Sequence, residues 1–433
     1  MNLNNLRSIF YNNGCQRIYV KKLSPNDNSK NQIYLGGSFE ILNIFPLSNI
    51  IVESVGDWKR ERFKASLNFS WIGDDTSSYP APKSQFVLYP KYPEVRFSGF
   101  LSGCQNPPSD LMTQRLEGRL LFLAVAQNGI VLGYIASPDS EIAEEFTNLN
   151  ITTAMGVFQV MELITFASTK QSLLEELRKI NLKDWINSKR LDSNGNILPC
   201  ISPNCGGYTL EAELGITPNG YSEPDYLGWE IKQFGVKKFD LINSSIITLM
   251  TPEPTGGFYV SQGVKAFIFE YGYDDLSGRS DRKNFGGIHK VGEIHSRTKL
   301  KMELIGFDNE SGKIMNADGK IALIDHEENE AASWSFSSLL LHWNRKHNQA
   351  CYVPSICLKV PKLKYKYGNE VILGIGTDFH LFLAEMYNKN IYYDPGIKME
   401  NVSTTQNTKR RSQFRIKSIN LGKLYKTSEI VTL

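Results

Sequence analysis

The chain has 433 residues, of which 41% are hydrophobic and 21% are charged, and its formal net charge is +3. This length allows two or three domains with full cores, and the composition is ordinary for a soluble globular protein. No run approaches the ~18 apolar residues of a membrane span, and the N-terminus lacks the basic-then-apolar pattern of a signal peptide. We therefore expect a cytoplasmic protein without a membrane partner. The absence of a P-loop also argues against an ATP-driven translocase.

Residues 1–165 consist of short apolar runs that Gly, Pro, Asn and Asp interrupt. Their alternation and spacing predict an all-β barrel or pseudobarrel, with a short helix at about residues 140–149. Two loops of this domain are either ordinary charged loops or DNA contacts, because Lys and Arg bind phosphate while Arg, Asn and Glu read base edges. The candidates for DNA binding are Lys21, Lys22, Asn26 and Lys30 in the first loop and Lys91, Glu94 and Arg96 in the second.

Residues 166–198 are predicted to form a junction between two domains. Leucine and isoleucine recur at helical spacing up to residue 182, and a turn-rich loop follows before the second domain, residues 199–433. The cysteine pairs Cys200/Cys205 and Cys351/Cys357 are spaced more widely than a C-x2-C zinc knuckle. We therefore expect free thiols rather than a zinc site.

The aromatic and β-branched residues after Pro224 predict a strand that runs from Tyr226 past Ile231. Side chains alternate along a strand, so Glu230 and Lys232 share one face. Asp225 reaches that face only if the chain bends near Gly228, where a glycine makes a bend easy.

Two carboxylates and a lysine on one face suit metal-dependent phosphodiester hydrolysis. Carboxylates hold a hard divalent cation, which acidifies a bound water and neutralises charge on the phosphate. A neighbouring lysine orients the water and stabilises the oxyanion. Glu211 adds a third acid, because Thr209 is predicted to cap a helix and to place Glu211 in its first turn. On spacing alone, a solvated face with weak ion pairs remains the alternative.

Basic residues gather near the C-terminus. Residues 351–433 contain 13 Lys and Arg against 6 Asp and Glu, so the local net charge is 13 − 6 = +7. Such an excess suits either phosphate contact or a solvated lysine face. An amphipathic helix is predicted to end near Asn348. The candidate DNA-binding residues of this domain are Arg282 and His289 on a glycine-rich loop, and Lys398, Arg410, Arg411 and Arg415.

The motifs TLE at 209–211, LGI at 214–216, PD at 224–225 and EIK at 230–232 resemble the MvaI/BcnI restriction endonucleases, a branch of the PD-(D/E)XK nucleases. The likeness continues in DRKNFGG and in the W-S-F…W-N-x-K-H helix. It implies an α/β restriction-endonuclease-like fold for the second domain and Asp225 and Glu230 as Mg²⁺ ligands. It further implies Lys232 as catalytic lysine, Glu211 as auxiliary acid, double-stranded DNA as partner, and a monomer in a bacterium or archaeon.

The segment KKLSPND, followed by a strand and a helix ending in IFP, resembles the EcoRII-type N-terminal effector-binding domain, which has a B3-like pseudobarrel fold. Together the two resemblances imply a Type II, IIE-like restriction endonuclease acting at CC(A/T)GG and engaging two copies of its site. The alternative is a modification-dependent or accessory nuclease whose specificity lies only in the N-terminal domain.

Overall fold

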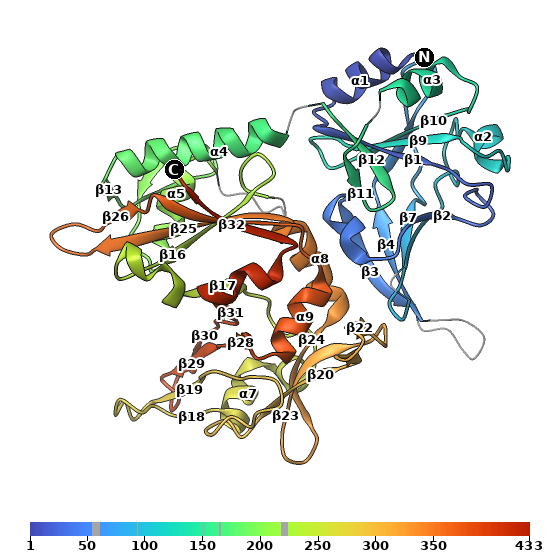
Figure 1. Cartoon of the computed structure of the whole chain (residues 1–433). Helices are drawn as coiled ribbons and strands as arrows, with labels where there is room; N and C mark the ends of the chain where they lie inside the picture. Colours follow the sequence, from blue (N-terminus) through green and yellow to red (C-terminus); the bar gives the residue numbers. More distant parts are fainter. Residues whose placement is uncertain (54–60, 93, 150, 164–165, 218–223) are drawn as a thin grey trace. The chain divides into compact units, whose positions relative to one another are not determined.

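The computed structural model describes residues 1–53, 61–92, 94–149, 151–163, 166–217 and 224–433 (Figure 1). The chain divides into two compact units, Met1–Gln171 and Ser172–Leu433, and each is described by itself. The mixed class of helices and strands expected from the sequence is confirmed. The predicted domain boundary at residue 165 lies outside the described residues, so the assignment of functions to the units stays a prediction.

Two sheets form the first unit. The strands of the larger sheet follow the order β11 (Ala154–Met155), β12 (Phe158–Glu162), β1 (Arg17–Lys22), β9 (Leu120–Val125), β10 (Val131–Ala136), β5 (Phe69–Ile72), β6 (Ser78–Pro80). Those of the smaller sheet follow the order β2 (Ile33–Gly36), β8 (Glu94–Ser98), β7 (Gln85–Tyr89), β4 (Arg62–Leu67), β3 (Leu47–Glu53). Because the two sheets are separate in the described residues, closure into a pseudobarrel stays a prediction.

Helices pack on the larger sheet of the first unit and build its core. α1 (Leu3–Asn12) and α3 (Glu141–Asn148) supply buried apolar side chains that join those of β9. The rings of Phe122 and Phe146, for example, meet edge to face with centroids 5.6 Å apart. The position of α3 confirms the short helix predicted at residues 140–149. The remaining short helices are α2 (Ser109–Thr113) and η1 (Phe39–Asn43).

A six-stranded mixed sheet organises the second unit. Its main order is β13 (Ile186–Asn187), β26 (Lys364–Tyr367), β25 (Gln349–Leu358), β27 (Glu370–Ile375), β32 (Thr427–Thr432), and β16 (Glu230–Gly235) joins β25 in parallel. The predicted junction helix is confirmed as α4 (Phe166–Leu182), which runs beside this sheet (Figure 1). Its Asn181 side chain donates a hydrogen bond to the carbonyl of Tyr367 at 2.8 Å.

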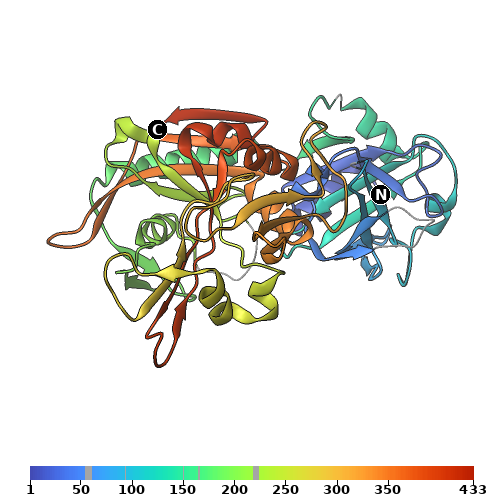
Figure 2. The same ribbon diagram turned by 90° about the horizontal axis from the view of Figure 1, so that it is seen from below.

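Smaller sheets and helices complete the second unit. The sheets are β17 (Ile246–Met250) with β31 (Phe414–Lys417) and β28 (Ile391–Tyr393); β18 (Tyr273–Asp274) with β19 (Arg282–Gly286), β29 (Gly396–Glu400) and β30 (Asn407–Lys409); β20 (Lys301–Ile305) with β23 (Lys320–Ile324) and β24 (Glu330–Ser335); β14 (Lys189–Leu191) with β15 (Ile197–Pro199); and β21 (Phe307–Asp308) with β22 (Lys313–Ile314). In Figure 2 the β29–β30 hairpin projects from the unit. The helices are α5 (Cys205–Glu213), α6 (Phe258–Ser261), α7 (Gly263–Tyr271), α8 (Phe336–His347), α9 (Phe379–Tyr387), η2 (Phe239–Ser244) and η3 (Ser418–Leu424).

Helix α8 confirms the amphipathic helix predicted to end near Asn348. Ser335 caps it, because its hydroxyl accepts a hydrogen bond from the amide of Ser338 at 3.3 Å. Leu339, Leu340 and Trp343 are buried and form its core face. Within the described part of the chain, none of the helices combines the length and apolar character that crossing a bilayer requires.

One expectation about the cysteines is wrong. Cys200 and Cys205 form a disulfide, whereas we had expected both to be free thiols. The bond closes the short loop that leads into α5. The sequence spacing alone gave no means of distinguishing this pairing from two separate thiols. Cys15, Cys104, Cys351 and Cys357 are free, as expected.

Candidate active site

A tight turn precedes the strand that carries the predicted catalytic residues. The backbones of Tyr226 and Trp229 exchange two hydrogen bonds, of 2.9 and 2.8 Å, around Leu227 and Gly228. Leu227 has φ 48° and Gly228 has φ 86°, which is the left-handed geometry of a two-residue hairpin turn. The predicted bend at Gly228 is therefore confirmed, but β16 begins only at Glu230 and not at Tyr226 as expected.

Glu230 and Lys232 lie on one face of β16, as the alternation of side chains predicts. The Nζ atom of Lys232 is 3.0 Å from Oε1 of Glu230. Glu230 is 4% exposed, and its Oε2 is buried without a hydrogen-bond partner in the described structure. A buried carboxylate oxygen without a partner is costly, so this atom marks a place for a cation or a donor from outside the chain.

Asp225 folds back onto the start of β16. Its Oδ2 atom accepts a hydrogen bond from the amide of Ile231 at 3.0 Å. Burial and the negative charge of Glu230 raise the pKa of Asp225 to about 7, and the charges of Lys232 and Lys346 partly offset this rise. The charges of two acidic side chains thus act on each other at this site, which is typical of a cation site.

The predicted helix cap at Thr209 is wrong. α5 begins at Cys205 after Asn204, so Thr209 lies inside the helix and Glu211 lies near its end. The Thr209 hydroxyl instead donates to the carbonyl of Lys189 and accepts from its amide, both at 3.1 Å. These bonds tie α5 to β14, which is why a threonine stands in a helix interior.

Glu211 lies within electrostatic reach of the other acids without joining them in one ligand cluster. Burial and the charge of Glu230 raise the pKa of Glu211. Glu211 also lines a pocket of about 120 Å³ together with Arg190, Leu191, Tyr208 and Ile216. Among the described residues, no group of three or more acids, histidines or cysteines has the arrangement of a metal site.

Asp225 and Glu230 fit a hard divalent cation. Both offer carboxylate oxygens, and Oε2 of Glu230 has no competing partner in the described structure. Mg²⁺ is commonly held by one or two carboxylates and completes its octahedral shell with water and substrate oxygens. A third protein carboxylate is therefore not required, and Glu211 fits better as a nearby acid than as a ligand.

Helix α8 brings further ionisable residues toward this site that the sequence did not assign to it. Lys346 acts on the pKa values of both Glu211 and Asp225, and His342 is influenced by the charges of Lys346, Lys232 and Glu230. Burial is the main cause that lowers the pKa of His342. His342 and Lys346 are four residues apart, a spacing that places both on one helical face and could have revealed them.

Arg282 and Lys398 line one pocket of about 320 Å³ in the β18–β19–β29–β30 sheet. Nε of Arg282 lies 3.2 Å from Asp275, and Nζ of Lys398 lies 2.7 Å from Glu400. Asn284, which donates to Asp275 at 3.1 Å, lines the same pocket and was not among the sequence candidates. The pocket therefore presents both hydrogen-bond donors and acceptors.

The three C-terminal arginines differ in their surroundings. Nη1 of Arg415 lies 2.6 Å from Asp394, so its guanidinium already has a carboxylate partner. Arg410 and Arg411 are exposed, and no ion pair is found for either in the described structure. These two are thus the freer candidates for contact with an external anion.

His289 does not occupy the DNA-facing position predicted from the sequence. It is 1% exposed, and its ring nitrogens bond to the carbonyl of Gly287 at 3.0 Å and to the hydroxyl of Thr298 at 2.9 Å. Its ring stacks between Phe285 and His295. Burial and the nearby charge of His295 lower the pKa of His289 to about 3. The structure assigns it a packing role.

The structure brings residues of the two predicted DNA-binding loops of the first unit together, but Glu94 and Arg96 lie on strand β8 and not in a loop. A pocket of about 620 Å³, here called the first-unit pocket, is lined by Lys21, Ser24, Asn26, Asp27, Asn31, Gln32, Tyr34, Glu94 and Arg96. Lys22, Lys30 and Lys91 are exposed outside this lining. Glu94 and Arg96 form an ion pair within β8. Lys21 is only 6% exposed, so it is not the accessible loop lysine that was predicted.

The chain resembles known proteins in sequence and in structure. The profile of the MvaI/BcnI restriction endonuclease family matches residues 174–425, more than half of the chain. No curated protein gives a significant match. Similar solved structures include a complex of restriction endonuclease MvaI with cognate DNA substrate (17% identity, TM-score 0.46, 61% of this chain and 99% of that chain) and MvaI without DNA (17%, 0.34, 62% and 99%). The B3 domain of restriction endonuclease UbaLAI with cognate DNA is also similar (18%, 0.24, 36% and 96%). By its family match, the chain belongs to the MvaI/BcnI restriction endonuclease family and is a site-specific DNA nuclease.

Proposed function

We propose that the protein is a Type II restriction endonuclease that cleaves double-stranded DNA at CC(A/T)GG with Mg²⁺ as cofactor. The observation that carries the chemical part is the geometry at the start of β16. Lys232 pairs with one oxygen of Glu230 at 3.0 Å, while the other oxygen is buried without a partner in the described structure. The recognition sequence is inferred from the family resemblance of the catalytic motifs and of the N-terminal segment.

The chain's own groups have distinct roles in this proposal. Asp225 and Glu230 hold the cation, and the backbone amide of Ile231 fixes the orientation of the Asp225 carboxylate. Lys232 donates to the attacking water and to a phosphate oxygen, so it stabilises charge that develops during in-line displacement. When bound, Mg²⁺ supplies Lewis acidity and a water of lowered pKa. Glu211 acts as an auxiliary acid at the edge of the site.

We further propose that the second unit reads DNA through Arg282, Lys398, Arg410, Arg411 and Arg415, and that the enzyme acts as a monomer. One set of Asp225, Glu230 and Lys232 can promote the attack of water on one phosphodiester at a time, so the two strands are cut in succession. Arginine suits the recognition of DNA because its guanidinium binds guanine or phosphate through two parallel hydrogen bonds.

In the same proposal the first unit binds a second copy of the site and stimulates cleavage, as in a IIE-like enzyme. The first-unit pocket supports this because it combines residues from both predicted DNA-binding loops. Arg96 offers donors and Glu94 offers an acceptor, a combination that can read base edges. Lys22, Lys30 and Lys91 are exposed and suited to phosphate contacts.

Digestion of plasmid DNA with Mg²⁺, followed by run-off sequencing of the ends, tests the proposal. We expect discrete fragments that end within CC(A/T)GG and that the Asp225→Ala variant does not produce. An excess of EDTA should abolish cleavage by the unmodified chain. Scattered ends, or cleavage of modified DNA only, would instead favour a nuclease whose specificity lies in the N-terminal unit alone.

A further inference from the structure

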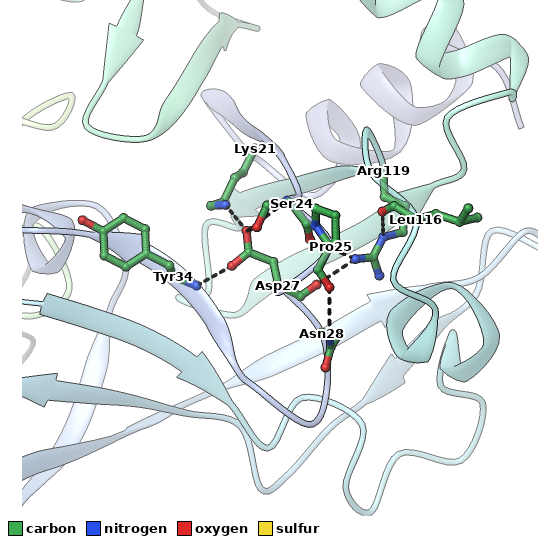
Figure 3. Close-up of polar contacts among 8 residues, drawn as sticks. All are labelled: Lys21, Ser24, Pro25, Asp27, Asn28, Tyr34, Leu116 and Arg119. Carbon is green, nitrogen blue, oxygen red and sulfur yellow. Dashed lines mark hydrogen bonds and ion pairs between the residues drawn. The ribbon is translucent and has the colours of Figure 1, made fainter.

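Figure 3 shows a polar cluster, part of which lines the first-unit pocket. At its centre is the carboxylate of Asp27, which is 5% exposed. Its Oδ2 atom accepts from Nζ of Lys21 at 2.5 Å and from the amide of Ser24 at 3.2 Å. Its Oδ1 atom accepts from the amide of Tyr34 at 2.9 Å. One side chain thus joins the end of β1, the following loop and β2.

Arg119 holds the backbone of the same loop, which contains Ser24 and Asp27. It is fully buried, and it donates to the carbonyls of Ser24 and Asp27 at 3.3 and 2.9 Å and to those of Leu111 and Leu116 at 2.6 and 2.8 Å. Buried charges need partners, and the acid whose charge acts on Arg119 is Asp27. The loop is therefore held both by the Asp27 side chain and by its backbone carbonyls.

The Asp27 carboxylate also contacts β2, the strand that pairs with β8 in the opposite pocket wall. Asp27 accepts a hydrogen bond from the amide of Tyr34, which pairs with Arg96 across β2 and β8. The register of these two strands shifts just beyond this pair. Because the hydrogen-bond ladder between β2 and β8 is disrupted at this irregularity, the added hydrogen bond from the Tyr34 amide to Asp27 helps to fix the backbone of β2. Asn26 lies on the loop side of the pocket and Arg96 on the strand side.

We infer that Asp27 is a positioning residue that holds the loop of Asn26 and the β2–β8 wall with Arg96 in one arrangement before DNA binds, with Lys21 as its buried counter-ion. This inference rests on the proposed DNA-binding function of that unit. Holding loops in place before binding reduces the conformational entropy lost on association. It also changes the role of Lys21, because an ammonium used internally is not a phosphate contact.

Equilibrium binding of the full chain to a short duplex with one CCTGG sequence, without metal, tests the inference. Asp27→Asn keeps the shape of the side chain but turns an amide donor toward Lys21 or Tyr34. We expect binding that is about tenfold or more weaker. Arg96→Ala serves as the reference, since it removes a group from the pocket wall directly. The double variant Lys21→Gln with Asp27→Asn restores a donor–acceptor pair and should lose less affinity than the two single variants combined.

The salt dependence of binding separates positioning from direct phosphate contact. Each phosphate contact adds ~0.9 to the slope of log affinity against log salt. Lys22→Gln, at an exposed neighbouring lysine, should lower that slope by about one contact. Asp27→Asn and Lys21→Gln should weaken binding with the slope unchanged. A slope lowered by Lys21→Gln would show that Lys21 contacts phosphate, and the inference would be wrong.

Hydrogen exchange in the free chain gives an independent measure. Asp27→Asn should accelerate exchange of the Ser24 and Tyr34 amides and leave the amides of β9 unchanged. Accelerated exchange throughout β9 would mean that Asp27 holds the whole unit, which overturns the inference. Weaker binding in Arg96→Ala but not in Asp27→Asn would overturn it while leaving the DNA-binding function intact. If Arg96→Ala, Lys22→Gln and Asp27→Asn all bind as the unmodified chain does, the proposed function of the unit is wrong and the inference falls with it.

Discussion

The ammonium of Lys232 lies 3.0 Å from Oε1 of Glu230, and the two side chains leave the same face of β16. The lysine is therefore a counter-ion for the acid in the free protein. In the proposed mechanism a cation would lie on the other side of Glu230, and the same ammonium would donate to a water or a phosphate oxygen. One residue pair thus serves both the resting site and the proposed reaction.

Replacing Lys232 with alanine should reduce the rate of DNA cleavage about 100-fold or more, because a preorganised donor to the developing charge is lost. Binding of the cognate duplex without metal should change little. Single-turnover cleavage and a binding titration measure the two effects. Lys237→Ala, at an exposed lysine just beyond the same strand, is the matched control. Equal losses in both variants would mean that general positive charge matters rather than this contact.

Asp225→Asn should abolish cleavage and yet raise the free energy of unfolding of the metal-free protein by about 1 kcal/mol. The reason is that Asp225 is partly buried, and this burial together with the like charge of Glu230 raises its pKa to about 7. An asparagine keeps the acceptor for the Ile231 amide and removes the repulsion. Chemical denaturation at a pH above 7 measures the change, with the exposed Asp240→Asn as control. A less stable Asp225→Asn variant would contradict this account.

The second unit should lose stability in mild acid. The folded-state pKa of His289, about 3, lies below its ordinary value of 6.5, so the unfolded chain binds more protons between these two pH values. The stability that the neutral ring provides is complete above about pH 6.5 and falls as pH decreases, by up to about 1.4 kcal/mol per pH unit for one histidine. Thermal unfolding at a series of pH values measures the slope. His289→Gln should flatten it, whereas His326→Gln, at an exposed side chain, should leave it unchanged.

Arg411→Ala should relax sequence discrimination in cleavage at one base pair, by about 1–3 kcal/mol in the ratio of rates for cognate and altered sites. Arg411 is exposed, no ion pair is found for it in the described structure, and its guanidinium lies close to Gly396 of β29. Cleavage of a set of duplexes with single base changes measures the effect. Lys417→Ala, at an exposed position on the same stretch, should weaken all sites alike or have no effect.

Local sequence patterns predicted α3, α4 and α8, the bend at Gly228 and the shared face of Glu230 and Lys232. These features depend on spacing and on the backbone preferences of single residues. The misplaced cap at Thr209 has a different cause, because its hydroxyl bonds to Lys189, twenty residues earlier in the chain. No local rule weighs such a contact against a helix cap.

Burial of polar residues was the least predictable property. Lys21 was expected to face DNA, but it pairs with the buried Asp27. The backbone of Asp27 is in turn bound by Arg119, which lies 92 residues further along the chain. His289 was expected on an exposed loop, but Tyr393 pairs with its backbone and Phe285 stacks on its ring. In both cases the decisive neighbour comes from a distant part of the chain.

The turn from Tyr226 to Trp229 sets a limit on how the length of this chain can change. Asp225 and Glu230 stand on either side of a closed two-residue turn, so inserting or deleting one residue there would rotate Glu230 and Lys232 to the opposite face of β16. The loop between β25 and β26 carries no such constraint, since Val360 at its tip is 77% exposed. Libraries of length variants should therefore retain cleavage for changes in that hairpin and lose it for any change between Asp225 and Glu230.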